Sequence, residues 1–137
     1  MSEQTSNNIF PTGEPAPSEY FTGIVNVKNL VPDDNLFNCV INNVTFEKGA
    51  RTNWHKHPGG QIILITDGEG LYQEKGGPVQ ILKKGDVVKF NPDIEHWHGA
   101  SPENSMTHIA INPNSEKGLV EWLKSLTEEE YSKKMDQ

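Results

Sequence analysis

The sequence predicts an all-β fold, one small barrel followed by a short helical segment. Between residues 39 and 112, short apolar runs alternate with turn signals about every 8 to 12 residues, which is typical of a sandwich or a barrel. The chain has 137 residues and no internal repeat, so we expect one domain with one core. After Pro113 the apolar spacing changes to that of a helix, which indicates that the barrel ends there.

The strands are expected where the apolar runs lie. Residues 20–27 would form the first strand. The further candidate strands are 39–46, 52–56, 61–66, 70–74, 79–82, 87–90, 96–99 and 105–112. The clearest turn signals between them are Pro58-Gly59-Gly60, Asp67-Gly68, Lys84-Gly85-Asp86 and Asn91-Pro92. Residues 20–113 are therefore predicted to be the barrel.

The two ends of the chain differ from this pattern. Residues 1–19 are rich in Ser, Thr, Asn, Pro and Gly, and they hold too few apolar side chains to offset the entropy of ordering, so we expect a flexible arm. Residues 114–137 are expected to form helices that pack on the barrel. The apolar residues at helical spacing are Leu119, Trp122, Leu123 and Leu126. Thr127 and Glu130 match a capping box, which would start a second short helix.

Composition narrows the possible partners and compartment. The chain has 12 basic and 19 acidic residues and a net charge of −7, which disfavours nucleic acid and anionic membranes as partners. Cys39 has no second cysteine to pair with, which fits a reducing compartment. The start has neither a basic nor an apolar signal region, and no apolar stretch approaches the roughly 20 residues that span a bilayer. We therefore expect a cytoplasmic protein.

The chemistry is expected around a pair of histidines in the β region. Side chains alternate across a strand, so His55 and His57 point the same way. Pro58-Gly59-Gly60 then reverses the chain, and Gln61 opens the next strand beside the pair. Gln61 shares its parity with two apolar residues, so its amide should face the barrel interior.

A fourth group comes from the segment after Asn91-Pro92, where His96 follows the turn. Three imidazoles and one amide oxygen, from His55, His57, Gln61 and His96, would then meet inside the barrel. Such a set fits one divalent Mn, Fe, Ni or Zn ion per chain. An amide cancels none of the metal's charge, so the ion would remain a strong Lewis acid, and four protein ligands would leave positions open for substrate.

The first of these segments resembles the first motif of the cupin family. That motif reads Gly, five residues, His-x-His, three or four residues, Glu, six residues and Gly. The matching positions are Gly49, His55, His57, Gln61 and Gly68, with Gln in place of Glu. Five positions at fixed spacing are far more specific than a lone His-x-His.

The second segment resembles the second cupin motif, which reads Gly, five residues, Pro-x-Gly, two residues and His. Gly85 and His96 match, whereas Asn91 stands at the Pro position and Asp93 at the Gly position, so the turn there can differ in shape. The resemblance covers residues 39–112. It implies the cupin fold, a double-stranded β-helix or jelly-roll barrel.

Longer stretches resemble the bacterial cupins with hydroxynitrile lyase activity, which are similar to cupins associated with carboxymuconolactone decarboxylases. These stretches are residues 50–61, 85–88, 96–100 and 106–108. The resemblance implies manganese as the metal, with His55, His57, Gln61 and His96 as its ligands. It also matches His108 to a further histidine near the metal.

Other side chains near these motifs have two interpretations each. His108 would be either a proton carrier or a hydrogen-bonded core residue. His98 is expected to have a structural role or to lie at the rim. Trp54 and Trp97 alternate with the ligands, so they should point away from the cavity and pack, either within the chain or at a dimer interface. Arg51 would line the mouth of the barrel or form a surface ion pair.

Three functions remain open from the sequence. The first is a metal-dependent lyase that cleaves a 2-hydroxynitrile to an aldehyde and cyanide, with His108 taking the hydroxyl proton. The second is a metal-dependent dioxygenase or isomerase that acts on a small organic acid. The third is a barrel without catalysis, which binds a small ligand or serves as an accessory to a decarboxylase-type protein. The resemblance to small single-barrel cupins also implies a homodimer.

Overall fold

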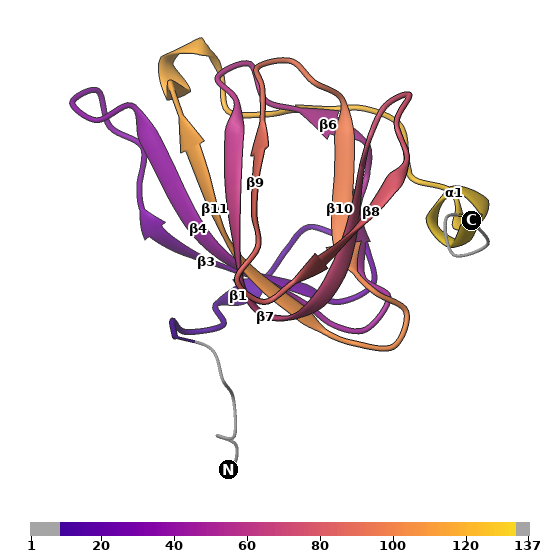
Figure 1. The fold of residues 1–137 in the computed structure, drawn as a ribbon. Coiled ribbons are helices and arrows are strands. Elements are labelled where there is room, and N and C mark those ends of the chain that lie inside the picture. Colours follow the sequence, from indigo (N-terminus) through magenta and orange to yellow (C-terminus); the bar gives the residue numbers. More distant parts are fainter. Residues whose placement is uncertain (1–8, 134–137) are drawn as a thin grey trace.

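The computed structural model describes residues 9–133 and shows antiparallel strands curled into a barrel, with one short helix outside it (Figure 1). The strands are β1 (Glu14–Pro15), β2 (Phe21–Thr22), β3 (Val25–Val31), β4 (Cys39–Phe46), β5 (Arg51–Thr52), β6 (His55–Lys56), β7 (Gln61–Glu74), β8 (Val79–Lys83), β9 (Val87–Phe90), β10 (His96–Ala100), β11 (Met106–Pro113) and β12 (Glu121–Trp122). The helix is α1 (Glu128–Lys133), and Ser115–Lys117 form a 3₁₀ turn. The all-β barrel predicted from the sequence is confirmed.

The strands follow the order β1-β3-β4-β11-β7-β10-β5-β2, and β7 joins the two sides of the barrel. The first half of β7 pairs with β9 and β11, and its second half pairs with β8 and β10. The inward side chains of both sides form one core, which includes Phe46, Ile63, Leu82, Phe90 and Met106. His55 lies on β6, His96 on β10 and His108 on β11, and His57 directly follows β6.

β7 is longer than the sequence predicted. The expected break at Asp67-Gly68 is wrong, because the strand runs without interruption from Gln61 to Glu74. Thr66 is an extra residue opposite the Thr107–His108 step of β11, and such a bulge bends a strand without ending it. Gly68 has a φ of 79°, and a Cβ there would overlap the Ser105 carbonyl, so this glycine allows close strand approach.

The helix expected over Leu119–Leu126 is also wrong. The chain is extended here, and β12 pairs with β6 at the edge of the barrel. Trp54 donates its backbone N–H to the carbonyl of Lys124 and accepts a bond from the N–H of Leu123. The apolar side chains divide between two sites, because Leu119 lines the cavity whereas Leu126 packs outside the barrel. Backbone hydrogen bonds to the edge of the barrel therefore keep this segment extended, although its apolar residues have helical spacing.

The predicted capping box is present at the start of α1. Glu130 donates its N–H to the Thr127 hydroxyl, 3.0 Å away, and its carboxylate accepts the N–H of Thr127 at 2.9 Å. This reciprocal pair satisfies N–H groups that the first turn of a helix leaves free. The short helical segment expected at the C-terminus is therefore present. Within residues 114–133 it consists of the 3₁₀ turn Ser115–Lys117 and the α-helix α1.

The described part of the N-terminal segment lies on its own barrel. β1 pairs with β3, and Asn43 of β4 donates its amide to the carbonyl of Pro11 at 3.1 Å. Residues 1–8 of the predicted arm lie outside the described residues, so their flexibility stays a prediction. The division of the chain at residues 19 and 113 also stays a prediction. Within residues 9–133, no helix has the length and apolar character needed to cross a membrane.

Candidate metal centre

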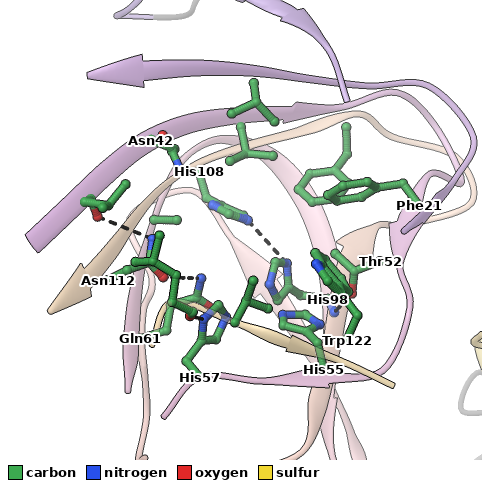
Figure 2. Close-up of a pocket in the computed structure, with 17 residues that line it drawn as sticks. Phe21, Asn42, Thr52, His55, His57, Gln61, His98, His108, Asn112 and Trp122 are labelled. Carbon is green, nitrogen blue, oxygen red and sulfur yellow. Dashed lines mark hydrogen bonds between the residues drawn. The ribbon is translucent and has the colours of Figure 1, made fainter. Parts of the chain in front are cut away.

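A cavity of about 190 Å³ opens inside the barrel (Figure 2). It is lined by every predicted site residue except His96, namely by His55, His57, Gln61 and His108. The apolar part of its wall comes mainly from β4 and the C-terminal segment. Imidazoles and other polar groups form the rest of the wall. The polar side chains that line the cavity are Asn42, Thr52, His55, His57, Gln61, His98, His108 and Asn112. A small apolar cavity with a few convergent polar groups is typical of a small-molecule site.

The local strand pairing brings His55, His57 and His96 together. His55 on β6 lies directly opposite His96 on β10, and their ring centroids are 4.4 Å apart. The ring of His57 lies 5.0 Å from that of His55 and 5.6 Å from that of His96. Phe90 stacks on the His96 ring at 3.7 Å, which fixes the plane of this imidazole.

Backbone carbonyls determine which nitrogen of these three rings can bind a metal. The Nδ1 atoms of His55, His57 and His96 lie 2.9, 2.6 and 2.9 Å from the carbonyl oxygens of Asn53, Leu119 and Ile94, respectively. A carbonyl only accepts, so each Nδ1 must carry the hydrogen. In the neutral ring, Nε2 then presents a lone pair, which is the arrangement of metal-binding histidines.

Burial keeps these rings neutral. Desolvation, followed by the nearby His96 and His57, lowers the pKa of His55 well below its usual value. Desolvation also lowers the pKa of His57, and it lowers the pKa of His96 to about 3. Neutral imidazole is the form that ligates metals, so the site needs no deprotonation at neutral pH.

Gln61 adds an oxygen to the cluster. Its Oε1 lies 3.4 Å from Nε2 of His96, and its Nε2 donates to Oδ1 of Asn112 at 3.0 Å. Because His96 carries its hydrogen on Nδ1, the 3.4 Å contact joins two acceptors, which is unfavourable unless a cation lies near both. This contact, together with the lone pairs of the three rings, fits a divalent transition metal.

Unpartnered buried atoms indicate the same centre. Within the described residues, Nε2 of His57, Nε2 of His98 and Nδ1 of His108 are buried without a hydrogen-bond partner. A buried polar atom without a partner destabilises a fold. A metal ion in contact with Nε2 of His57 would remove one of these penalties.

His98 lies closer to the cluster than the sequence suggested. The ligand atoms of His55, His96 and His98 lie within 4.8 Å of one another, and His57 is not part of that trio. His98 is 4 % exposed and lines the cavity, so it does not lie at the rim. His96 and His98 are two residues apart on β10, so their side chains point to the same face. This spacing was the feature of the sequence that indicated the position of His98.

His98 also contacts His108 of β11. Nδ1 of His98 lies 3.3 Å from Nε2 of His108, so the two rings share one hydrogen bond (Figure 2). No carbonyl determines the tautomer of His98, in contrast to the other two members of the trio. Burial lowers the pKa of His108 to about 3, so its ring is neutral at neutral pH.

Arg51 and the two tryptophans lie away from the cavity. Arg51 forms an ion pair with Glu128 at 2.7 Å, and its guanidinium lies 4.1 Å from the centre of the Tyr131 ring. Trp54 and Trp97 are buried in a second apolar cluster with Leu126 and Tyr131. The outward packing predicted for both tryptophans is present, and their partner is the C-terminal segment of the same chain.

Comparison with known proteins agrees with this geometry. Residues 42–112 match the family model described as the cupin domain. The chain is 44% identical to an (R)-mandelonitrile lyase from Granulicella tundricola over 117 residues, which cover 84% of this chain and 88% of that protein. It is 53% identical to a cupin-like protein from Thermotoga maritima, whose crystal structure superposes with a TM-score of 0.91 and covers 93% of this chain and 97% of that one.

A more distant structure shows the fold alone. A cupin 2 conserved barrel domain protein from Rhodopseudomonas palustris is 17% identical, with a TM-score of 0.68 over 90% of this chain and 83% of that one. The family model alone spans more than half of the chain, and the relative from Granulicella covers most of it. From this match and from the barrel that carries the histidine cluster, we conclude that the chain belongs to the cupin family.

Proposed function

We propose that the protein is a metal-dependent lyase that cleaves a 2-hydroxynitrile to an aldehyde and cyanide. The observation that carries the proposal is the position of the neutral imidazoles, which converge on an apolar cavity large enough for a small molecule. The 44% identity to an (R)-mandelonitrile lyase supports this reaction over the other chemistries that the cupin barrel can host.

We assign the metal to Nε2 of His55, His57 and His96 and Oε1 of Gln61, and we favour manganese over Fe, Ni and Zn. The three rings are chosen because backbone carbonyls hold each of them in the tautomer that a ligand needs. His98 lacks such a carbonyl, and its Nδ1 contacts another imidazole. When bound, the ion supplies a Lewis acid that polarises a substrate oxygen or nitrogen.

The apolar wall of the cavity would bind the organic part of the nitrile. Phe21, Phe46 and Trp122 supply aromatic surface, and aliphatic side chains such as Val44 and Ala110 supply the rest. These residues lie beside the imidazoles in the same cavity. A hydroxynitrile whose aryl or alkyl group packs on the wall would therefore have its hydroxyl group near His98 and His108. The apolar part of the wall offers water few hydrogen-bond partners.

His108 is the proposed proton carrier. As the bond to the nitrile carbon breaks, its electron pair leaves with cyanide. The hydroxyl oxygen becomes the aldehyde oxygen, and its proton passes to the His108 ring. The contact with His98 orients this ring. The proton then passes from the His108 ring to the departing cyanide, which restores the neutral imidazole.

The test is cleavage of mandelonitrile by the purified protein, measured as benzaldehyde release with Mn²⁺ and after metal removal. We expect metal-dependent release, and a loss of about 10²–10⁴-fold in the His108→Ala variant, which retains the proposed ligands. Equal release with and without metal would contradict the proposal. Iron in the protein from its host, together with oxygen consumption, would favour a dioxygenase instead.

We further propose a homodimer. Along β4, β11, β7 and β9, the side chains that alternate with the core form a continuous apolar face. Its members are Ile41, Ile62, Leu64, Val87, Ile109 and Ile111, whose strand pairing places them in two adjacent rows. A face of this kind supports contact between two copies. Light scattering should give twice the mass of 15.3 kDa, and the mass of one chain would contradict the proposal.

A further inference from the structure

We infer that Asn112 is a positioning residue that turns the carboxamide of Gln61 so that its oxygen faces the metal centre. The inference rests on the proposed metal site. Asn112 lies on β11, and its side chain bonds to the amide group of Gln61. Both side chains are nearly inaccessible, with 7 % of Asn112 and 5 % of Gln61 exposed.

Strand pairing places Asn112 between a backbone carbonyl and the ligand. Asn112 lies opposite Val40 of β4, and its Nδ2 donates to the Val40 carbonyl at 3.3 Å. Its Oδ1 accepts the Nε2–H of Gln61 at 3.0 Å. The contacts continue from Oε1 of Gln61 to Nε2 of His96 at 3.4 Å. Figure 2 shows these amides beside His57 at one end of the cavity.

The direction of the contacts follows from hydrogen-bond chemistry. A backbone carbonyl can only accept, so Asn112 must turn its amino group toward Val40. Its carbonyl oxygen then faces Gln61 and can also only accept. Gln61 must therefore turn its own amino group toward Asn112, which leaves Oε1 directed at the centre. A reversed Gln61 would place two acceptors together and direct an amino group at the metal.

The donor-to-acceptor direction of these hydrogen bonds also explains why residue 61 is an amide, whereas the cupin pattern has Glu at this position. A carboxylate has no hydrogen to give to Oδ1 of Asn112, so the two oxygens would repel each other in a buried place. Asn112 cannot turn around without losing its bond to Val40. Asn112 therefore favours a neutral ligand at this position, which leaves the full charge of the ion available to a substrate.

The test measures metal affinity without substrate. In Asn112→Leu, which keeps the volume of the side chain and removes its acceptor, we expect the affinity for Mn²⁺ measured by calorimetry to fall about 10- to 100-fold. The matched control is Asn42→Leu, because Asn42 lines the same cavity but bonds to Asn29 and not to Gln61. Its Mn²⁺ affinity should stay within about twofold of wild type, since it leaves the ligand amide in place.

A second background separates positioning from simple structural support. In Gln61→Glu the ligand has two equivalent oxygens and needs no orienting, so adding Asn112→Leu should leave the Mn²⁺ affinity unchanged or raise it. The inference would be overturned if Asn112→Leu lowered the Mn²⁺ affinity equally in the wild type and in Gln61→Glu. It would also be overturned if Asn112→Leu caused no loss of Mn²⁺ affinity in the wild type. If the leucine variants do not fold, Asn112→Ala gives the same comparison. Wild-type Mn²⁺ binding without benzaldehyde release would instead overturn only the proposed reaction.

Discussion

At the scale of single residues, backbone carbonyls determine the chemistry of the centre. Each of the three proposed imidazole ligands gives its Nδ1 hydrogen to a carbonyl, which leaves Nε2 for a metal. His98 lies equally deep, but its neighbour is the imidazole of His108. The histidines at positions 96 and 98 therefore lie on one face of β10 and are assigned different roles.

This assignment predicts opposite effects for two neighbouring substitutions. His96→Ala should lower the Mn²⁺ affinity by at least about 100-fold, whereas His98→Ala should change it by less than about tenfold and should reduce mandelonitrile cleavage. Calorimetry of the metal-free variants measures the first effect and a benzaldehyde assay the second. A loss of about 100-fold in both variants would instead assign the metal to the trio of His55, His96 and His98.

The sequence could predict only part of this site. The side-by-side placement of His55 and His57 followed from strand alternation, and the turn at Pro58-Gly59-Gly60 brought Gln61 beside them. The contacts of Asn112 and the Leu119 carbonyl could not be predicted, because they depend on which distant strands pair and in which register. Strand alternation showed that His98 shares a face with His96, but not how deep that face lies.

At the scale of elements, the C-terminal segment contributes to both sides of the barrel wall. Its first part supplies the Leu119 carbonyl to His57 and the Trp122 ring, 4.8 Å from the His55 ring. Its last part, α1, places Tyr131 against Arg51 and donates the Tyr131 hydroxyl to the carbonyl of Ala100. α1 therefore anchors a segment that holds two of the proposed ligands.

Removal of the Tyr131 ring should measure the strength of this anchor. Tyr131 is 3 % exposed, so Tyr131→Ala should lower the free energy of unfolding by about 3 kcal/mol, because it leaves a cavity in the outer cluster. Tyr131→Phe keeps the ring and loses one hydrogen bond, so it should cost about 1 kcal/mol. Urea unfolding followed by tryptophan fluorescence measures both. Equal effects of the two variants would show that the ring does not anchor the segment.

The failure of the helix prediction has a cause at this same scale. Helical spacing of Leu119, Trp122, Leu123 and Leu126 indicates that these residues can share a face, but not that they do. The free edge of β6 and the backbone of Trp54 need partners, and the C-terminal chain supplies them. At Thr127 the capping box forms as predicted, because its two hydrogen bonds join residues only three positions apart.

At the scale of the whole molecule, the barrel could be predicted because each level of the sequence agrees with it. Apolar alternation, turn residues at regular spacing and one uniform segment of strands all favour the same architecture. The exact strand boundaries were harder to predict. A glycine at position 68 indicates a turn when read locally, whereas the structure uses it for close contact with Ser105.

Burial of histidines should make the stability of the metal-free protein depend on pH. Burial lowers the pKa of His108 from 6.5 to about 3, so the unfolded chain binds one more proton between these values. The contribution of neutral His108 to the free energy of unfolding is fully present above pH 6.5 and is lost as the pH falls toward 3. From pH 7 to pH 5, His108 alone should account for a loss of about 2 kcal/mol.

Urea unfolding at the two pH values measures this loss in the metal-free wild type. His108→Asn removes the titrating ring and keeps a polar side chain, so its decrease between pH 7 and pH 5 should be smaller than that of the wild type. An identical decrease in both proteins would show that His108 is not held neutral by burial.

In the proposed centre, three imidazoles and one amide of this barrel hold a single divalent ion. The most direct measurement is the anomalous scattering of crystals of the Mn²⁺-loaded protein, which locates the ion independently of the surrounding side chains. We predict one Mn²⁺ per chain, in contact with Nε2 of His55, His57 and His96 and with Oε1 of Gln61. A cavity without an anomalous peak, or a peak held by other side chains, would contradict the account.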